Sequence, residues 1–171
     1  MVDLVAVEAV LERAWQRESE WHGETHWRCV AATGLGLVGR LAGGDPELVF
    51  LFGLLHDTRR ENEHVDPGHG PRAAAYAQEL AAEGVLEVEP ARLELLCGAI
   101  TEHTNGLVSA DPTIGACWDA DRLHLPRVSI DPDPARFSTP HAHGTEPLAA
   151  AGRLRAAPPT WAELVEAAAQ T

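Results

Sequence analysis

The chain has 171 residues, of which 45% are hydrophobic and 23% charged, a composition typical of a folded domain with a hydrophobic core. Its formal net charge is -13, and all 13 of its basic residues are arginines. The lack of lysine excludes a Schiff-base lysine and a phosphate-loop lysine, and the acidic balance argues against binding of a nucleic acid polymer. The length and the hydrophobic content together predict one domain over residues 1–171.

The cysteines and the apolar segments favour a cytoplasmic protein. The three cysteines are far apart and form no C-x-x-C pair, so neither a disulfide framework nor a thiolate zinc site is indicated. The longest apolar run, residues 48–55, is too short to cross a bilayer. The N-terminal segment carries acids early and does not resemble a secretory signal. We expect no membrane partner, and the sequence leaves a homo-oligomer open.

Hydrophobic periodicity predicts helices from the N-terminus onward. An amphipathic pattern indicates a helix over residues 3–20 and a second helix over 24–42. Asp45 followed by Pro46 is typical of a helix start, because aspartate caps the first turn and proline fits the first helical position. This third helix is apolar and leads directly into His56 and Asp57.

Three later segments each begin with an acidic residue and a proline ahead of an apolar periodic pattern. They predict helices over about 68–83, 91–104 and 112–124. Residues 126–147 are rich in proline and have no helical period, so we expect an irregular segment there. A short helix over 160–169 is predicted to start at Thr160, with Glu163 completing a capping box. No strand pair is evident, and the predicted class is all-α.

A glycine motif at residues 34–39 matches the letters G-x-G-x-x-G. The dinucleotide-binding interpretation needs a preceding strand and a βαβ unit. The preceding residues have helical periodicity instead, so we interpret these small residues as allowing close helix packing.

The sharpest chemical feature is the pair His56 and Asp57 at the end of an apolar helix. An ionised carboxylate left unpaired in such a place would be costly, and a divalent cation would resolve that cost. The alternative is a polar helix end exposed to solvent. Further polar residues continue the apolar stripes of other predicted helices and should face inward. They are His26, His69, His103 and Asp121.

Three segments together resemble the H…HD…D signature of the HD-domain superfamily of metal-dependent phosphohydrolases. The segments are HWRCV from His26, LLHDTRR around His56 and Asp57, and WDADRLHLPR around Asp121. The resemblance covers about residues 20–125 and implies an HD-domain helical bundle. It implies a metal held by His26, His56, Asp57 and Asp121, the last preferred over Asp119 because it precedes a basic-leucine pair and shares the apolar stripe.

Binuclear members of that superfamily add two histidines between the HD pair and the last aspartate, and His69 and His103 occupy suitable places. The resemblance therefore implies one or two divalent ions, with Mn, Fe, Zn, Mg, Co and Ni not distinguished. Metal-activated water would then attack a small phosphorylated molecule such as a nucleotide. Asp57 is expected to help orient that water.

Arginines are expected to offset the phosphoryl charge, because their planar fork matches phosphate. Arg60 is the expected catalytic arginine, and Arg122 is the first candidate for substrate binding, followed by Arg28 and Arg72. His22 is expected to contact substrate or to support a ligand. Two alternatives stay open: a di-iron oxygenase of the same superfamily that cleaves a small organic substrate with dioxygen, and a non-catalytic metal-containing binding module.

Overall fold

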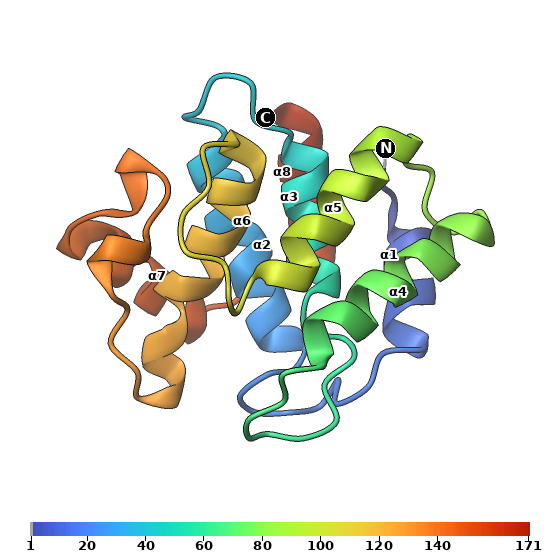
Figure 1. Ribbon diagram of the computed structural model, residues 1–171, viewed down its shortest axis with the longest axis horizontal. Coiled ribbons are helices and arrows are strands. Elements are labelled where there is room, and N and C mark those ends of the chain that lie inside the picture. Colours follow the sequence, from blue (N-terminus) through green and yellow to red (C-terminus); the bar gives the residue numbers. More distant parts are fainter. Residues whose placement is uncertain (1) are drawn as a thin grey trace.

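The computed structural model describes residues 2–171 and contains, within that range, eight α-helices, three short 3-10 helices and no β-strand. The α-helices are α1 (Leu4–Glu12), α2 (Glu24–Val38), α3 (Pro46–Leu55), α4 (His69–Ala82), α5 (Pro90–Glu102), α6 (Pro112–Leu123), α7 (Thr145–Ala156) and α8 (Trp161–Gln170). The 3-10 helices are η1 (Leu125–Val128), η2 (Pro134–Arg136) and η3 (Pro140–Ala142). The predicted all-α class is confirmed (Figure 1).

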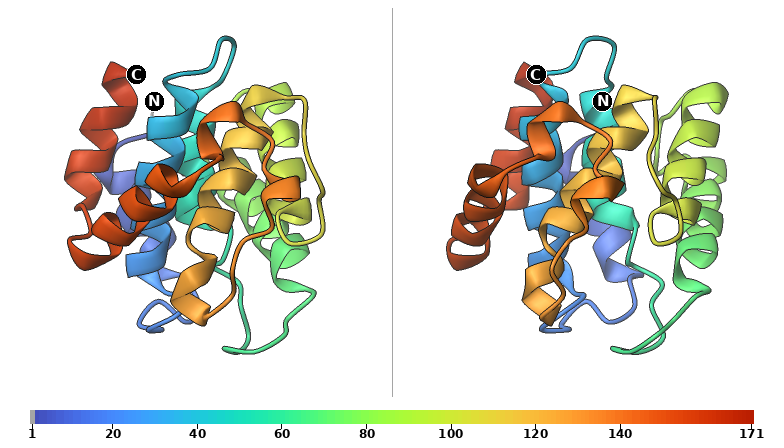
Figure 2. Two further views of the ribbon diagram at one scale, coloured as in Figure 1. Left: turned by 90° about the vertical axis from the view of Figure 1, so that its left-hand side faces the viewer. Right: turned by 60° about the vertical axis from the view of Figure 1, so that its left-hand side comes forward.

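The helices are arranged in layers around α3. Helices α2, α3 and α6 pack on one another in the middle, α4 pairs with α5 on one flank, and α7 and α8 cover the other flank (Figure 2). Both chain ends lie at the top of the bundle in Figure 1, and the loop between α3 and α4 lies at the bottom. The lower ends of several helices therefore meet at that loop.

Helix α3 is the centre of the hydrophobic core. Every residue from Leu48 to Leu55 is buried, because the helix is surrounded by others and is therefore apolar on all sides. Its start follows the predicted pattern: the side chain of Asp45 accepts a hydrogen bond from the Leu48 amide, and Pro46 stands at the first position. Its end places His56 and Asp57 in the interior.

Small residues allow α2 to approach α3 closely. A Cβ added to Gly53 would lie 2.6 Å from the Cα and Cβ of Ala31, so a larger side chain would force these helices apart. Gly34 likewise faces Val49, whose Cγ1 would lie 2.5 Å from an added Cβ. Residues 34–38 are part of α2 and are preceded by helix, as the packing interpretation of the glycine motif requires.

Three predicted segments differ from the structure. The first helix ends at Glu12 instead of residue 20, and Trp15 turns away to donate its amide hydrogen to Thr58 O at 2.8 Å. The second ends at Val38 instead of residue 42. The segment expected to be irregular contains η1, η2, η3 and the start of α7, a helix that was not predicted. Only Ala151 of α7 is buried, so its sequence has no apolar stripe to reveal it.

No helix within residues 2–171 combines the length and the apolar character that a membrane span requires.

Candidate metal centre

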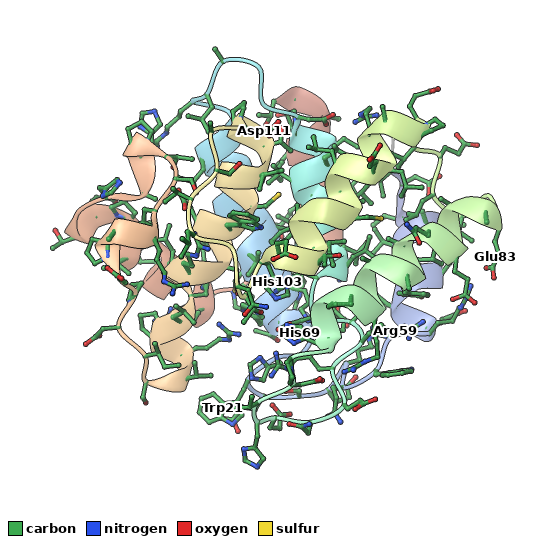
Figure 3. All side chains as sticks on the ribbon, viewed as in Figure 1. Trp21, Arg59, His69, Glu83, His103 and Asp111 are labelled. Carbon is green, nitrogen blue, oxygen red and sulfur yellow. The ribbon has the colours of Figure 1, made fainter. Side chains whose placement is uncertain are left out.

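The six residues predicted to bind metal come together at the lower end of the bundle. His26 lies in the first turn of α2, His56 and Asp57 follow α3, His69 begins α4, His103 follows α5, and Asp121 lies in the last turn of α6. The four histidines and Asp57 are each 5% exposed or less. Figure 3 shows His69 and His103 side by side where the lower ends of α4 and α5 meet.

One half of the cluster is formed by His26, His56 and Asp121. The Nε2 atoms of His26 and His56 are 3.2 Å apart, and Oδ1 of Asp121 lies 3.2 Å from Nε2 of His26. Oδ2 of Asp57 lies 3.8 Å from both of these imidazole nitrogens. Four donor atoms from three helix ends therefore surround one point.

The other half is formed by His69 and His103, whose Nε2 atoms are 2.9 Å apart. Oδ1 of Asp57 lies 3.3 Å from Nε2 of His69 and 3.8 Å from Nε2 of His103. The two oxygens of Asp57 thus face different histidine pairs. A carboxylate placed in this way could contribute one oxygen to an ion in each half.

Backbone hydrogen bonds fix the direction of three of the imidazoles. Nδ1 of His103 donates to Ile100 O at 2.7 Å, and Nδ1 of His69 donates to Asp66 O. Nδ1 of His56 donates to the carbonyls of Phe52 and Gly53, both at 3.2 Å. Because a carbonyl only accepts, Nδ1 carries the proton and the lone pair of Nε2 points into the cluster.

Opposed lone pairs at these distances repel one another unless a proton or a cation lies between them. Atoms that bind one ion at about 2.1 Å are separated by about 3.0 to 3.4 Å, close to the 3.2 and 2.9 Å between the histidine nitrogens of the two halves. The buried Oδ1 of Asp57 has no hydrogen-bond partner within the described residues, which a cation would supply. The residues therefore fit a divalent ion in each half, and imidazole and carboxylate donors suit several first-row metals.

Metal binding needs neutral imidazole and ionised carboxylate, and the pKa shifts of most cluster residues go in that direction, whereas the carboxylate of Asp57 raises the pKa of His103. Burial lowers the pKa of His56 to about 4 and lowers the pKa of His26 well below its ordinary value. Burial alone would raise the pKa of Asp57, but the charge of His56 and the proximity of His103 and His22 outweigh it and hold the pKa well below the usual range. Burial would also raise the pKa of Asp121, but the hydrogen bond with His26 outweighs burial and holds this pKa well below the usual range.

A cavity of about 730 Å³ opens over the cluster and gives it access to solvent. Asp57, His69, His103 and Asp121 form part of its wall. The rest comes from the loop before α4 at 63–67 and from the segment after α6, which includes η1 and η2. A small molecule in this cavity would lie directly against the ligand atoms.

Two further predicted residues reach the cluster. The Nη1 atom of Arg60 lies 3.5 Å from Oδ1 of Asp57, and Nη2 of Arg60 donates to His64 O at 2.7 Å. On the opposite side, Nδ1 of His22 lies 3.3 Å from Oδ2 of Asp57. Both side chains line the cavity.

The structure does not bring Arg28 and Arg72 to the cavity wall, because both find acceptors elsewhere. Nη1 of Arg28 donates to Pro159 O at 3.0 Å, beside the C-terminal helix. Nη2 of Arg72 donates to the two carboxylate oxygens of Asp66 at 2.7 and 2.6 Å. Neither guanidinium is therefore part of the cavity that opens over the cluster, and their expected substrate contacts stay a prediction.

Arg122 lines the cavity, but backbone carbonyls occupy its guanidinium. It donates to Gly106 O at 2.6 Å, to Leu107 O at 3.0 Å and to Arg136 O. These bonds tie together the two segments that flank the cavity. They leave Arg122 less free to bind a ligand than the sequence suggested.

Asp119 has a role distinct from that of Asp121. It is completely buried, and its two oxygens accept hydrogen bonds from the amides of Ser138 at 2.8 Å and Thr139 at 2.7 Å. The carboxylate therefore holds the segment after η2 against α6 and points away from the cluster. The preference for Asp121 agrees with this geometry.

Two residues at the site were not predicted. Arg127 follows α6 within η1 and lies with Nη2 at 3.2 Å from Nδ1 of His22 and Nη1 at 3.9 Å from Oδ1 of Asp121. His124 is fully buried beside the cluster, with its ring centroid 6.1 Å from that of His26. Both belong to the WDADRLHLPR segment, but no periodicity there indicates which way they point.

A scan against models of protein families and searches against curated proteins and solved structures give no match for this chain. The interpretation therefore depends on the geometry of the chain itself. That geometry is an all-helical structure with a buried His/Asp cluster able to hold metal, and it is compatible with an HD-like fold.

Proposed function

We propose that this protein is a metal-dependent phosphohydrolase of the HD-domain type that acts on a small phosphorylated molecule. The observation that carries the proposal is the position of Asp57 between two histidine pairs, with one carboxylate oxygen toward each. His26, His56 and Asp121 would hold one divalent ion, and His69 and His103 would hold the second. The order of these residues along the chain is that of the HD signature.

The surroundings of the cluster support phosphate chemistry. Arg60 lies at the cavity wall beside Asp57, where a guanidinium could bind the oxygens of a phosphoryl group. The cavity is open to solvent above the cluster, so both water and a small substrate can reach it. An acidic chain that handles phosphate needs such a local concentration of positive charge.

Divalent ions at this site would supply Lewis acidity and lower the pKa of a water ligand. The chain itself supplies the remaining functions. Asp57 orients the attacking water through its carboxylate, and Arg60 stabilises the negative charge that develops on the phosphoryl oxygens. The backbone carbonyls behind His56, His69 and His103 hold the imidazoles in the orientation that this arrangement requires.

The proposal is tested by elemental analysis of protein purified without added metal, followed by assays of p-nitrophenyl phosphate hydrolysis with manganese, magnesium, cobalt or nickel. We expect bound metal and metal-dependent phosphate release. His56→Ala and Asp57→Asn should lose metal and activity together, whereas His143→Ala, at an exposed position outside the cavity, should retain both.

Three results would overturn the proposal. The first is that His56→Ala or Asp57→Asn retains full metal content and full activity. The protein could contain two irons and consume dioxygen with an organic substrate. It could also hold metal yet release no phosphate from any member of a broad panel of phosphate esters and anhydrides.

A further inference from the structure

Two buried arginines flank Asp57 from opposite sides. The side chains of Arg60 and Arg127 are only 9% and 10% exposed, and both line the cavity. Arg60 lies beside Oδ1 of Asp57, on the side of the His69 and His103 pair. Arg127 lies on the other side, next to His22, whose Nδ1 is 3.3 Å from Oδ2 of Asp57.

These arginines have no acidic partner of their own at the cluster. The nearest carboxylate of Arg60 is Asp57 at 3.5 Å, and the nearest of Arg127 is Asp121 at 3.9 Å. Both carboxylates are needed as metal ligands. The whole cavity wall carries six carboxylates and four arginines, so two divalent ions at the cluster would leave the cavity with an excess of positive charge that favours a bound anion.

Hydrogen bonds to backbone carbonyls fix the position of the Arg127 guanidinium, and one N–H group of Nη2 stays available to bind a ligand. Nε donates to Trp21 O at 2.6 Å and Nη1 donates to His124 O at 3.1 Å. Nη2 has two hydrogens and one partner, His22 Nδ1 at 3.2 Å. Arg127 is therefore held rigidly with a donor left over, whereas Arg122 has its Nη1 shared between two carbonyls.

We propose that Arg127 is the second phosphate-binding residue of the site and acts opposite Arg60, so that one phosphate group is held between two guanidiniums above the cluster. This inference rests on the proposed function. Arginine suits the task because its charge is permanent and its N–H groups match the oxygens of phosphate. His22 then acts as a positioning residue, since its Nδ1 accepts one of the two hydrogens of Nη2 of Arg127 at 3.2 Å.

The experiment measures binding of inorganic phosphate to manganese-loaded protein by titration calorimetry, with metal content determined on the same samples. We expect Arg127→Gln to keep its metal and to bind phosphate about 10- to 100-fold more weakly, the effect of losing a charge-assisted contact. Arg127→Lys, which keeps the charge but not the planar fork, should lose less. Arg153→Gln is the control, because Arg153 is an exposed residue of α7 paired with Glu146.

The outcomes separate this inference from the function on which it rests. Wild-type protein that binds no metal overturns the proposed function. Wild-type protein that binds metal but no phosphate overturns the inference alone. Arg127→Gln that binds phosphate as tightly as wild type overturns it, as does a loss of metal from that variant. If Arg127→Gln does not fold, unchanged phosphate binding by Arg127→Lys overturns the inference instead.

Discussion

The Nε2 atoms of His69 and His103 lie 2.9 Å apart across the contact between α4 and α5. The residue after His69 makes this contact possible. A Cβ added to Gly70 would lie 2.8 Å from the carbonyl oxygens of both Ile100 and Thr101, so the two helix backbones approach closely only because this position has no side chain. One half of the candidate metal centre thus depends on a glycine outside the ligand set.

Gly70→Ala should therefore impair one metal site more than the other. The added methyl group forces α4 away from α5 at a cost of about 1–3 kcal/mol, as for other overpacked contacts. We expect elemental analysis to find one ion retained at the His26 and His56 pair and one lost. Gly98→Ala in α5 is the matched control, because nothing lies within 4 Å of an added Cβ there. Two ions bound in Gly70→Ala would contradict this account.

Asp119 and Asp121 should respond differently to the same substitution. Asp121→Asn removes a charged donor from the cluster and should weaken metal binding. Asp119→Asn replaces one of the two oxygens that accept from the Ser138 and Thr139 amides with an NH2 group, so it should lower the free energy of unfolding by about 1–3 kcal/mol. Urea unfolding and metal titration of both variants distinguish these effects. Metal loss in Asp119→Asn alone would reverse the assignment.

Metal should stabilise the folded protein measurably. A ligand that binds only the folded state at 100 times its Kd adds about 2.7 kcal/mol to the free energy of unfolding. We expect manganese to raise the Tm of chelator-treated protein and EDTA to lower it again. Asp57→Asn, which removes charge from between both histidine pairs, should abolish the metal-dependent shift. A Tm unaffected by any divalent ion in wild type would argue against a metal centre.

The helices that could be predicted from the sequence are those whose signals are local. Asp45 and Asp111 cap their own helices, and Thr160 and Glu163 form the expected capping box. Helix α7 gave no such signal, because neither a side-chain cap at its start nor an apolar stripe marks it. The first helix was predicted too long because Trp15 continues the apolar spacing although the chain has already turned.

Two kinds of sequence signal pointed to the candidate metal ligands. His26, His69, His103 and Asp121 continue the apolar stripe of a helix, and His56 and Asp57 follow an apolar helix. The resemblance to the HD signature then joined them into one ligand set. The surrounding arginines could not be assigned, since the partners of each one lie far away in the sequence. Arg127 is positioned by Trp21 and Arg28 by Pro159, contacts that only the folded chain creates. Sequence reasoning therefore identifies arginine as a residue type suited to the proposed phosphate ligand, but the tertiary structure decides which arginine faces the cavity.

Buried histidines should make the metal-free protein sensitive to acid. Burial lowers the pKa of His56 to about 4 and that of His124 to about 3, from an ordinary value of 6.5. Below pH 6.5 the unfolded chain therefore binds protons that the folded protein does not. The stability contributed by these residues is fully present above pH 6.5 and is lost as the pH falls toward the folded-state values.

Each of these histidines should cost about 2 kcal/mol of stability at pH 5 relative to pH 8. His103 opposes the trend: burial lowers its pKa, but the nearby carboxylate of Asp57 outweighs burial and raises it, so its contribution is present below pH 6.5. Urea unfolding of metal-free protein from pH 8 to pH 5 should show a falling free energy of unfolding. His124→Gln, which can still bond to Thr33, should reduce the slope because it does not titrate. A slope unchanged by this variant would mean that His124 is already protonated in the folded protein, against the low pKa that its burial imposes.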